Sequence, residues 1–137
     1  MRADLDKPNA VDGGSPAHIA AEHQNTDMVQ LLYDLGADVH RARPDGGRPI
    51  HAAAGIGRND TVLLLFSLRA SVDQIGGESG QTPLIMAASY GQTACVRLLC
   101  EIRSDVHHVS KEGAPAAEYA RQFGWPDTLA VLKEFGA

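Results

Sequence analysis

The sequence predicts an all-α fold built from stacked, similar helical units, and three observations support this prediction. A seven-residue motif, with proline near its start and paired alanines at its end, occurs at residues 15–21, 48–54 and 82–88. The prolines of these copies, Pro16, Pro49 and Pro83, are spaced by 33 and 34 residues. Aromatic residues form only 5% of the chain, so the core must consist mainly of small and aliphatic side chains, which favours close packing of helices.

A second landmark keeps the same period and marks the end of each unit. The segments 36–39, 69–72 and 103–106 each end in valine, and a weaker fourth copy of the proline motif lies at residues 115–121. A fixed period of this length is typical of repeat proteins, in which a unit cannot bury its apolar face alone and neighbouring units complete the core.

The three motif copies read SPAHIAA, RPIHAAA and TPLIMAA, and they resemble the TPLHxA signature of the ankyrin repeat. The resemblance covers residues 12–137 and implies a single domain of four units at about 12–44, 45–78, 79–111 and 112–137. Residues 1–11 then form an N-terminal stub. The family's architecture implies a solenoid of helix-turn-helix units, with turn tips at a right angle to the helices and a concave groove.

Each unit shows the same succession of elements. A glycine-rich turn opens it, and a short first helix follows, in which a proline at the first position loses no hydrogen bond. After a break, a second helix begins near Thr26, Asp60, Thr93 and Asp127. The paired alanines of the first helices allow neighbouring helices to approach at the short end of the ~8–10 Å packing range.

The two ends of the repeat array differ from its middle. Residues 3–5 resemble residues 37–39, which indicates either a stub or a fragment of a longer array. In the fourth unit Arg121 takes the place of the second alanine, and Lys133 takes the place of a bulky or apolar residue. We therefore interpret the fourth unit as a C-terminal cap, with sequence drift in one unit as the alternative.

The charge and the cysteines exclude several classes of protein. A formal net charge of −5 provides no basic surface for nucleic acid or an anionic membrane, and no stretch reaches the ~18 apolar residues of a membrane span. Cys95 and Cys100 do not form a disulfide framework, and unpaired thiols suit a reducing compartment. We expect a monomer in the cytoplasm, with the nucleus as the alternative.

The sequence contains no motif that predicts an enzyme, a cofactor site or a metal site. The glycine pairs lack the phosphate-binding pattern, and no nucleophile elbow is present. His18 and His51 occupy the signature position of the repeat, where the resemblance implies a structural role. The adjacent pair His107 and His108 lacks the spacing of a helical zinc site.

The resemblance also implies one possible modification. The position that follows the Asp/Ser-Val step holds His40, Asp73 and His107. In many ankyrin proteins an asparagine at this position is hydroxylated by the asparaginyl hydroxylase of the hypoxia pathway, which also accepts aspartate and histidine. We therefore regard these three residues as candidates for hydroxylation.

A column of residues indicates where a partner would bind. The position two residues after the alanine pair keeps the repeat period, and three of its four occupants are apolar or aromatic: His23, Ile56, Tyr90 and Phe123. Exposed apolar residues of this kind mark contact surfaces and supply hot spots. The alternative is that these side chains cover the seam between helices.

Polar and acidic residues are expected around this column, with Lys111 as the main exception: Asp12, Glu22, Asp45, Gln81, Glu112 and Gln122. An acidic rim would attract basic segments. The sequence thus predicts a noncatalytic interaction module that binds a basic and apolar protein segment without an obligatory small molecule. Two alternatives stay open: a regulatory fragment of a larger enzyme, kinase or channel, and a small-molecule or metal-binding protein.

Overall fold

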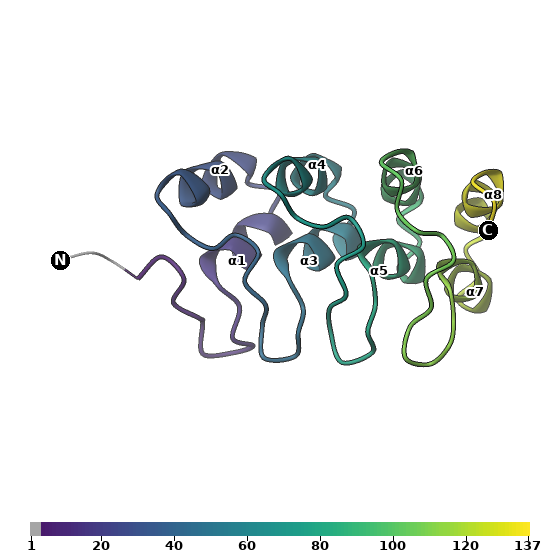
Figure 1. The fold of residues 1–137 in the computed structure, drawn as a ribbon, viewed down its shortest axis with the longest axis horizontal. Coiled ribbons are helices and arrows are strands. Elements are labelled where there is room, and N and C mark those ends of the chain that lie inside the picture. The colour runs from purple at the N-terminus through teal and green to yellow at the C-terminus, as the bar shows by residue number, and fades with distance from the viewer. Residues whose placement is uncertain (1–3) are drawn as a thin grey trace.

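The computed structural model describes residues 4–137, and within this range the chain forms eight helices and no named strand (Figure 1). The first helices of the four units are α1 (Pro16–Glu22), α3 (Pro49–Ile56), α5 (Pro83–Ser89) and α7 (Ala116–Gln122). The second helices are α2 (Thr26–Asp34), α4 (Asn59–Ser67), α6 (Thr93–Glu101) and α8 (Pro126–Glu134). The predicted all-α repeat fold is confirmed.

The helices form two layers, one of first helices and one of second helices (Figure 1). Each helix packs against the other helix of its own unit and against the corresponding helix of the next unit. The long loops between units extend away from both layers, on the side of the first helices. Backbone hydrogen bonds such as Arg43 N to Gly47 O at 2.7 Å and Gly76 N to Gln81 O at 2.9 Å close the loop tips.

Local sequence explains where the first helices begin. Pro16, Pro49 and Pro83 are the first helical residues, where the missing N–H costs nothing, and α5 is also capped by the Thr82 hydroxyl, which accepts from Ile85 N at 3.3 Å. In the fourth unit Pro115 is the N-cap and the helix begins one residue later.

The core lies between the layers and between successive units. The alanine pairs are almost completely buried, as are the largest aliphatic side chains of the second helices and of α5: Val29, Val62, Leu65, Leu84, Val96, Leu99 and Leu132. Stacking of the units therefore supplies the core, as the repeat pattern predicts.

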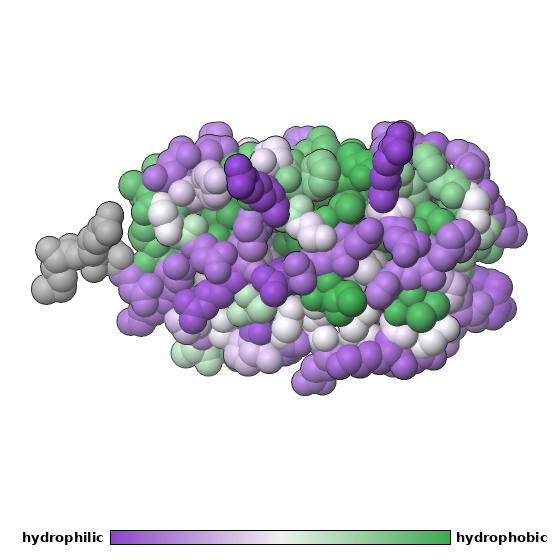
Figure 2. All heavy atoms as spheres, in the orientation of Figure 1, coloured by the Kyte–Doolittle hydropathy of each residue, from purple (hydrophilic) through white to green (hydrophobic). Residues whose placement is uncertain are grey.

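On the surface, hydrophobic residues appear over the layer of second helices, near α4 and α6, interrupted by hydrophilic side chains (Figure 2).

The segment before the first unit packs onto it. Leu5 is half-buried against the core, and the Asp6 carboxylate accepts the N–H of Asp38 at 2.9 Å. Asp73 makes the same contact with Asp105 N two unit boundaries further along, between the second and third units. Residues 4–11 thus contact the first unit as the end of a unit would, while residues 1–3 of the predicted stub lie outside the described range.

At the other end of the stack, the two charged substitutions of the fourth unit lie on the surface. Arg121 pairs with Glu118 on α7, and Lys133 is exposed near the end of α8. Among residues 4–137, no helix has both the length and the apolar character needed to cross a membrane.

Candidate functional site

The predicted column of contact residues lies at the C-terminal ends of the four first helices. Ile56 is the last residue of α3, and His23, Tyr90 and Phe123 directly follow α1, α5 and α7. All four are exposed, and the exposed fractions of the three apolar ones are 44% for Ile56, 61% for Tyr90 and 55% for Phe123. These three apolar side chains therefore leave roughly half of their surface open to solvent.

A second column lies one helical turn earlier on the same face: Ile19, Ala52, Met86 and Tyr119. Each member precedes a residue of the first column by four positions, and residues four apart lie one above the other on a helix. Sequence reasoning missed this column. The common spacing of four residues was the signal that could have revealed it.

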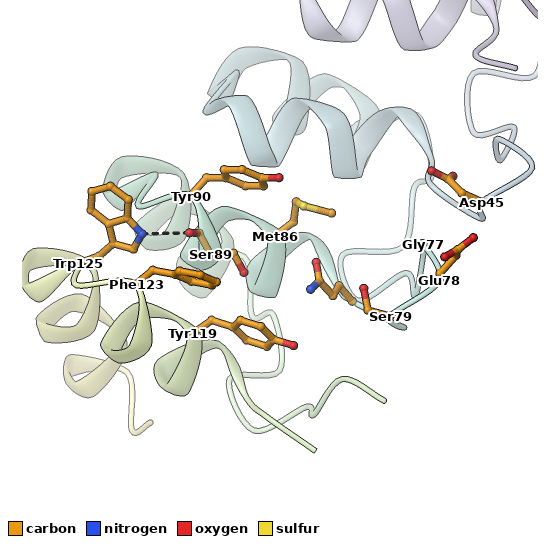
Figure 3. Close-up of a pocket in the computed structure, with 11 residues that line it drawn as sticks. Asp45, Gly77, Glu78, Ser79, Met86, Ser89, Tyr90, Tyr119, Phe123 and Trp125 are labelled. Atoms are coloured by element: carbon orange, nitrogen blue, oxygen red, sulfur yellow. Dashed lines mark hydrogen bonds between the residues drawn. The ribbon is translucent and has the colours of Figure 1, made fainter. Parts of the chain in front are cut away.

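The members of both columns on α5 and α7 and at their C-terminal ends border a hollow with a volume of about 890 Å³, which we call the aromatic hollow (Figure 3). Its helical side is formed by Met86, Ser89, Tyr90, Tyr119, Phe123 and Trp125. Its other side is formed by loop residues: Asp45, Gly77, Glu78, Ser79 and Gln81. Tyr90 and Phe123 lie on opposite sides of Ser89 in the close-up.

The aromatic walls are held in place by specific contacts. The Tyr119 hydroxyl donates to Glu112 Oε2 at 3.0 Å and lies 2.9 Å from Ser110 Oγ. The Tyr119 and Phe123 rings stack with centroids 6.3 Å apart and an interplanar angle of 17°. The hydrogen bonds of Tyr119 and its stacking on Phe123 fix the orientation of these two rings in the unbound chain.

Trp125 forms the end wall and belongs to a ladder of hydrogen bonds between units. The residue before each of the helices α4, α6 and α8 donates a side-chain hydrogen bond to a carbonyl near the end of the first helix of the preceding unit. Arg58 Nε donates to Glu22 O at 2.9 Å, Gln92 Nε2 to Gly55 O at 3.0 Å, and Trp125 Nε1 to Ser89 O at 3.0 Å. These bonds set the spacing of the first helices at the groove.

A second hollow of about 560 Å³ lies between α3 and α5, and we call it the adjoining hollow. Its floor includes Ala52, Gly55 and Ile56, and it shares Asp45, Gly77, Met86 and Tyr90 with the aromatic hollow. Tyr90 therefore separates two neighbouring depressions along one face of the stack.

Comparison with protein families identifies this architecture. A model described as "Ankyrin repeats (3 copies)" matches residues 1–76, and a model described as "Ankyrin repeat" matches residues 79–111. The chain belongs to the ankyrin repeat family. A comparison with curated proteins gives no match.

The charge of the ankyrin groove differs from the expected acidic rim at its N-terminal end. Arg43 forms ion pairs with Glu22 and with Asp12, the latter at 3.2 Å, so these two carboxylates are compensated. Sequence reasoning overlooked Arg43 because its partners are distant in the chain. Asp45 and Glu78 both line the aromatic hollow, and neither forms an ion pair with another of the residues 4–137 that the structure describes.

Some of the remaining predicted groove residues line one of the two hollows, and others do not. Gln81 lines the aromatic hollow and Glu22 lines the adjoining hollow. His23, Glu112 and Gln122 lie outside both linings, although Glu112 orients the Tyr119 hydroxyl.

The three candidate hydroxylation residues occupy different environments. His40 Nε2 donates to Leu68 O at 2.6 Å, and the Asp73 carboxylate accepts from Ser104 Oγ at 2.7 Å and from Asp105 N at 2.9 Å. His107 is exposed. Hydroxylation of His40 or Asp73 would require these bonds to open, so His107 is the most accessible of the three candidates.

The signature histidines connect turns within the stack. His18 Nδ1 accepts from Ser15 N at 3.1 Å while its Nε2 donates to Gly47 O at 3.1 Å, and His51 Nδ1 accepts from Arg48 N at 3.2 Å while its Nε2 donates to Gln74 O at 2.7 Å. Burial lowers the pKa of both imidazoles. Both rings therefore favour the neutral form at pH 7, in which one nitrogen accepts and the other donates.

The cysteines are buried, and burial changes their acidity. Burial raises the pKa of Cys95 to about 12 and that of Cys100 to about 11, which suppresses the nucleophilic thiolate. Within residues 4–137, no group of three or more His, Cys, Asp or Glu side chains is placed to hold a metal ion.

Proposed function

We propose that this ankyrin-repeat chain is a noncatalytic interaction module that binds a segment of another protein along its first helices. Ankyrin repeats are in general protein-interaction modules, and one observation carries the proposal for this chain. Ile56, Tyr90 and Phe123 keep the repeat period and are 44–61% exposed beside two adjoining hollows. Aromatic and apolar anchors in such depressions are where binding energy concentrates.

The size of the groove suits an extended segment. Four units at ~8–10 Å each give a face about 30–40 Å long, which accommodates roughly ten residues of extended chain at ~3.3–3.6 Å per residue. The carboxylates of Asp45 and Glu78 favour a basic segment over an acidic one. The free, buried thiols support a reducing compartment, which for this module means the cytoplasm or the nucleus.

A capture experiment with a matched control tests the proposal. The purified chain and its Tyr90→Ala/Phe123→Ala variant are used as bait in parallel, beside a Leu63→Ala/Phe66→Ala control that removes exposed apolar side chains from α4 instead. We expect a partner that the wild type and the control capture and the groove variant loses. In direct titration, Tyr90→Ala should weaken its binding by at least ~1 kcal/mol.

The outcome also addresses the alternative. If a partner binds Tyr90→Ala and Ile56→Asp with the same affinity as the wild type, this face is not its binding site. Recovery of a segment encoded in the same reading frame would favour a regulatory domain of a larger enzyme, kinase or channel, which uses the same groove for an intramolecular contact.

A further inference from the structure

The two hollows that share Tyr90 differ in chemistry. The aromatic hollow has four aromatic side chains, Tyr90, Tyr119, Phe123 and Trp125, and the described residues that line it include two carboxylates but neither lysine nor arginine. The adjoining hollow has Ala52, Gly55 and Ile56 at its floor, and its charged rim is mixed in sign.

Electrostatics favour a cation in the aromatic hollow. The faces of aromatic rings carry negative potential, and a cation positioned over them is attracted. Tyr90 and Phe123 present exposed rings on either side of Ser89, and Asp45 and Glu78 lie on the loop side opposite the helices (Figure 3). An apolar ligand would make no use of the negative charge of these two carboxylates, and an acidic ligand would be repelled.

The adjoining hollow favours a different side chain. Its arginines, Arg43 and Arg48, stand beside Glu22 and Asp45, and Arg43 is already paired with Glu22. A cation from a ligand would meet two guanidinium groups there. The aliphatic floor of Ala52, Gly55 and Ile56 instead offers contact to an apolar side chain.

We infer that the aromatic hollow binds an arginine side chain of the partner segment, while the adjoining hollow binds an aliphatic side chain of the same segment; this rests on the proposed function. Arginine fits better than lysine because its planar guanidinium stacks on aromatic faces and forms directional hydrogen bonds to carboxylates. Asp45 and Glu78 supply the carboxylates on the loop side of the hollow.

The spacing of the hollows predicts the spacing in the ligand. One hollow lies between α3 and α5 and the other between α5 and α7, so their centres are one unit apart, about 8–10 Å. An extended chain covers this in about three residues. The ligand motif is therefore an arginine with an aliphatic residue two to four positions away.

Selection of peptides tests this assignment without a known partner. A library of random twelve-residue peptides is selected on the wild-type chain, and the best binders are synthesised with arginine or with its neutral isostere citrulline. We expect an enriched arginine at the predicted spacing and at least a tenfold loss of affinity with citrulline. The variant Asp45→Asn/Glu78→Gln should lose a similar factor, and the control Asp60→Asn/Glu101→Gln, with the same change of charge on exposed residues of α4 and α6, should not.

Two results would overturn conclusions at different levels. Peptides that fail to bind Ile56→Asp but bind equally well with citrulline, or to the Asp45/Glu78 variant, refute the arginine site and leave groove binding intact. Peptides that bind the wild type and Ile56→Asp or Tyr90→Ala alike refute the groove itself. Circular dichroism of each variant verifies that the helices are retained.

Discussion

The indole Nε1 of Trp125 donates a hydrogen bond of 3.0 Å to Ser89 O in the preceding unit, and the indole ring consequently lies directly over Gly91. A Cβ atom on Gly91 would stand 2.5 Å from Trp125 Cδ2, which is closer than atoms can approach. One tryptophan thus closes the aromatic hollow and joins the third unit to the fourth.

This contact predicts a difference between two glycines in equivalent positions. Gly91 and Gly124 both have positive φ, 67° and 76°, so alanine at either position costs about 1 kcal/mol of backbone strain. Only Gly91→Ala also meets the indole ring, because nothing lies within 4 Å of a Cβ on Gly124. We expect Gly91→Ala to lose roughly 1–3 kcal/mol more of unfolding free energy than Gly124→Ala, measured by urea titration.

Removing the ring provides the control for that comparison. In a Trp125→Ala background, the two alanine substitutions should cost nearly the same. Equal losses in the wild-type background would instead show that the indole does not pack over Gly91.

The signature histidines predict acid sensitivity. His51 Nδ1 accepts the N–H of Arg48, and a proton on that nitrogen would abolish the hydrogen bond inside a buried site. The folded state holds the pKa of His18 and His51 below the ordinary ~6.5, so the unfolded chain binds more protons as the pH falls through this value. The unfolding free energy should therefore stay at its highest value above pH ~6.5 and decrease as the pH falls below this value.

Chemical denaturation at a series of pH values between 7.5 and 5.5 measures this slope. His51→Gln should be less stable at pH 7.5, because it loses the bond to Gln74 O, but its stability should depend less on pH. If the unfolding free energy of His51→Gln depends on pH as steeply as that of the wild type, His51 is not a source of the acid sensitivity.

Close packing of the first helices predicts a steric limit at the alanine pairs. Ala54 on α3 has no exposed surface, whereas Ala94 on α6 is exposed. Ala54→Leu should lower the unfolding free energy by about 1–3 kcal/mol through overpacking, while Ala94→Leu should stay within about 0.5 kcal/mol of the wild type. Thermal and urea unfolding of both variants distinguish this limit from a general intolerance of leucine in the helices.

The two thiols should be protected by the fold. With the pKa of Cys95 raised to about 12 and that of Cys100 to about 11, few thiolates exist at pH 8. We expect slow reaction with an aromatic disulfide reagent under native conditions and rapid reaction of both thiols in urea. Fast native labelling of Cys95, which is only 1% exposed, would contradict its buried position.

Most of the fold could be predicted because it repeats. The spacing of Pro16, Pro49 and Pro83 places the first helices, and two of the second helices begin at the predicted Thr26 and Thr93. The other two, α4 and α8, begin one residue before the predicted positions. Local signals such as proline at the first helical position operate within one turn, so the sequence alone reveals them.

The site was less accessible to sequence reasoning because its decisive contacts join distant residues. Arg43 neutralises Asp12 and Glu22 across 31 and 21 positions, and Trp125 reaches back to Ser89 across 36. The groove column through Tyr90 was visible by its period. The column through Tyr119 was not recognised, because its members range from alanine to tyrosine and share no residue type.

The ladder formed by Arg58, Gln92 and Trp125 uses three unrelated side chains to make one geometric connection. Each of these positions needs a side-chain N–H donor long enough to contact the carbonyl of the preceding unit, and several residue types can provide one. Evolution can therefore exchange these side chains, and with them the shape and polarity of the hollow beside each one, without changing the distance between successive units. Such a scaffold can acquire new binding specificities one boundary at a time.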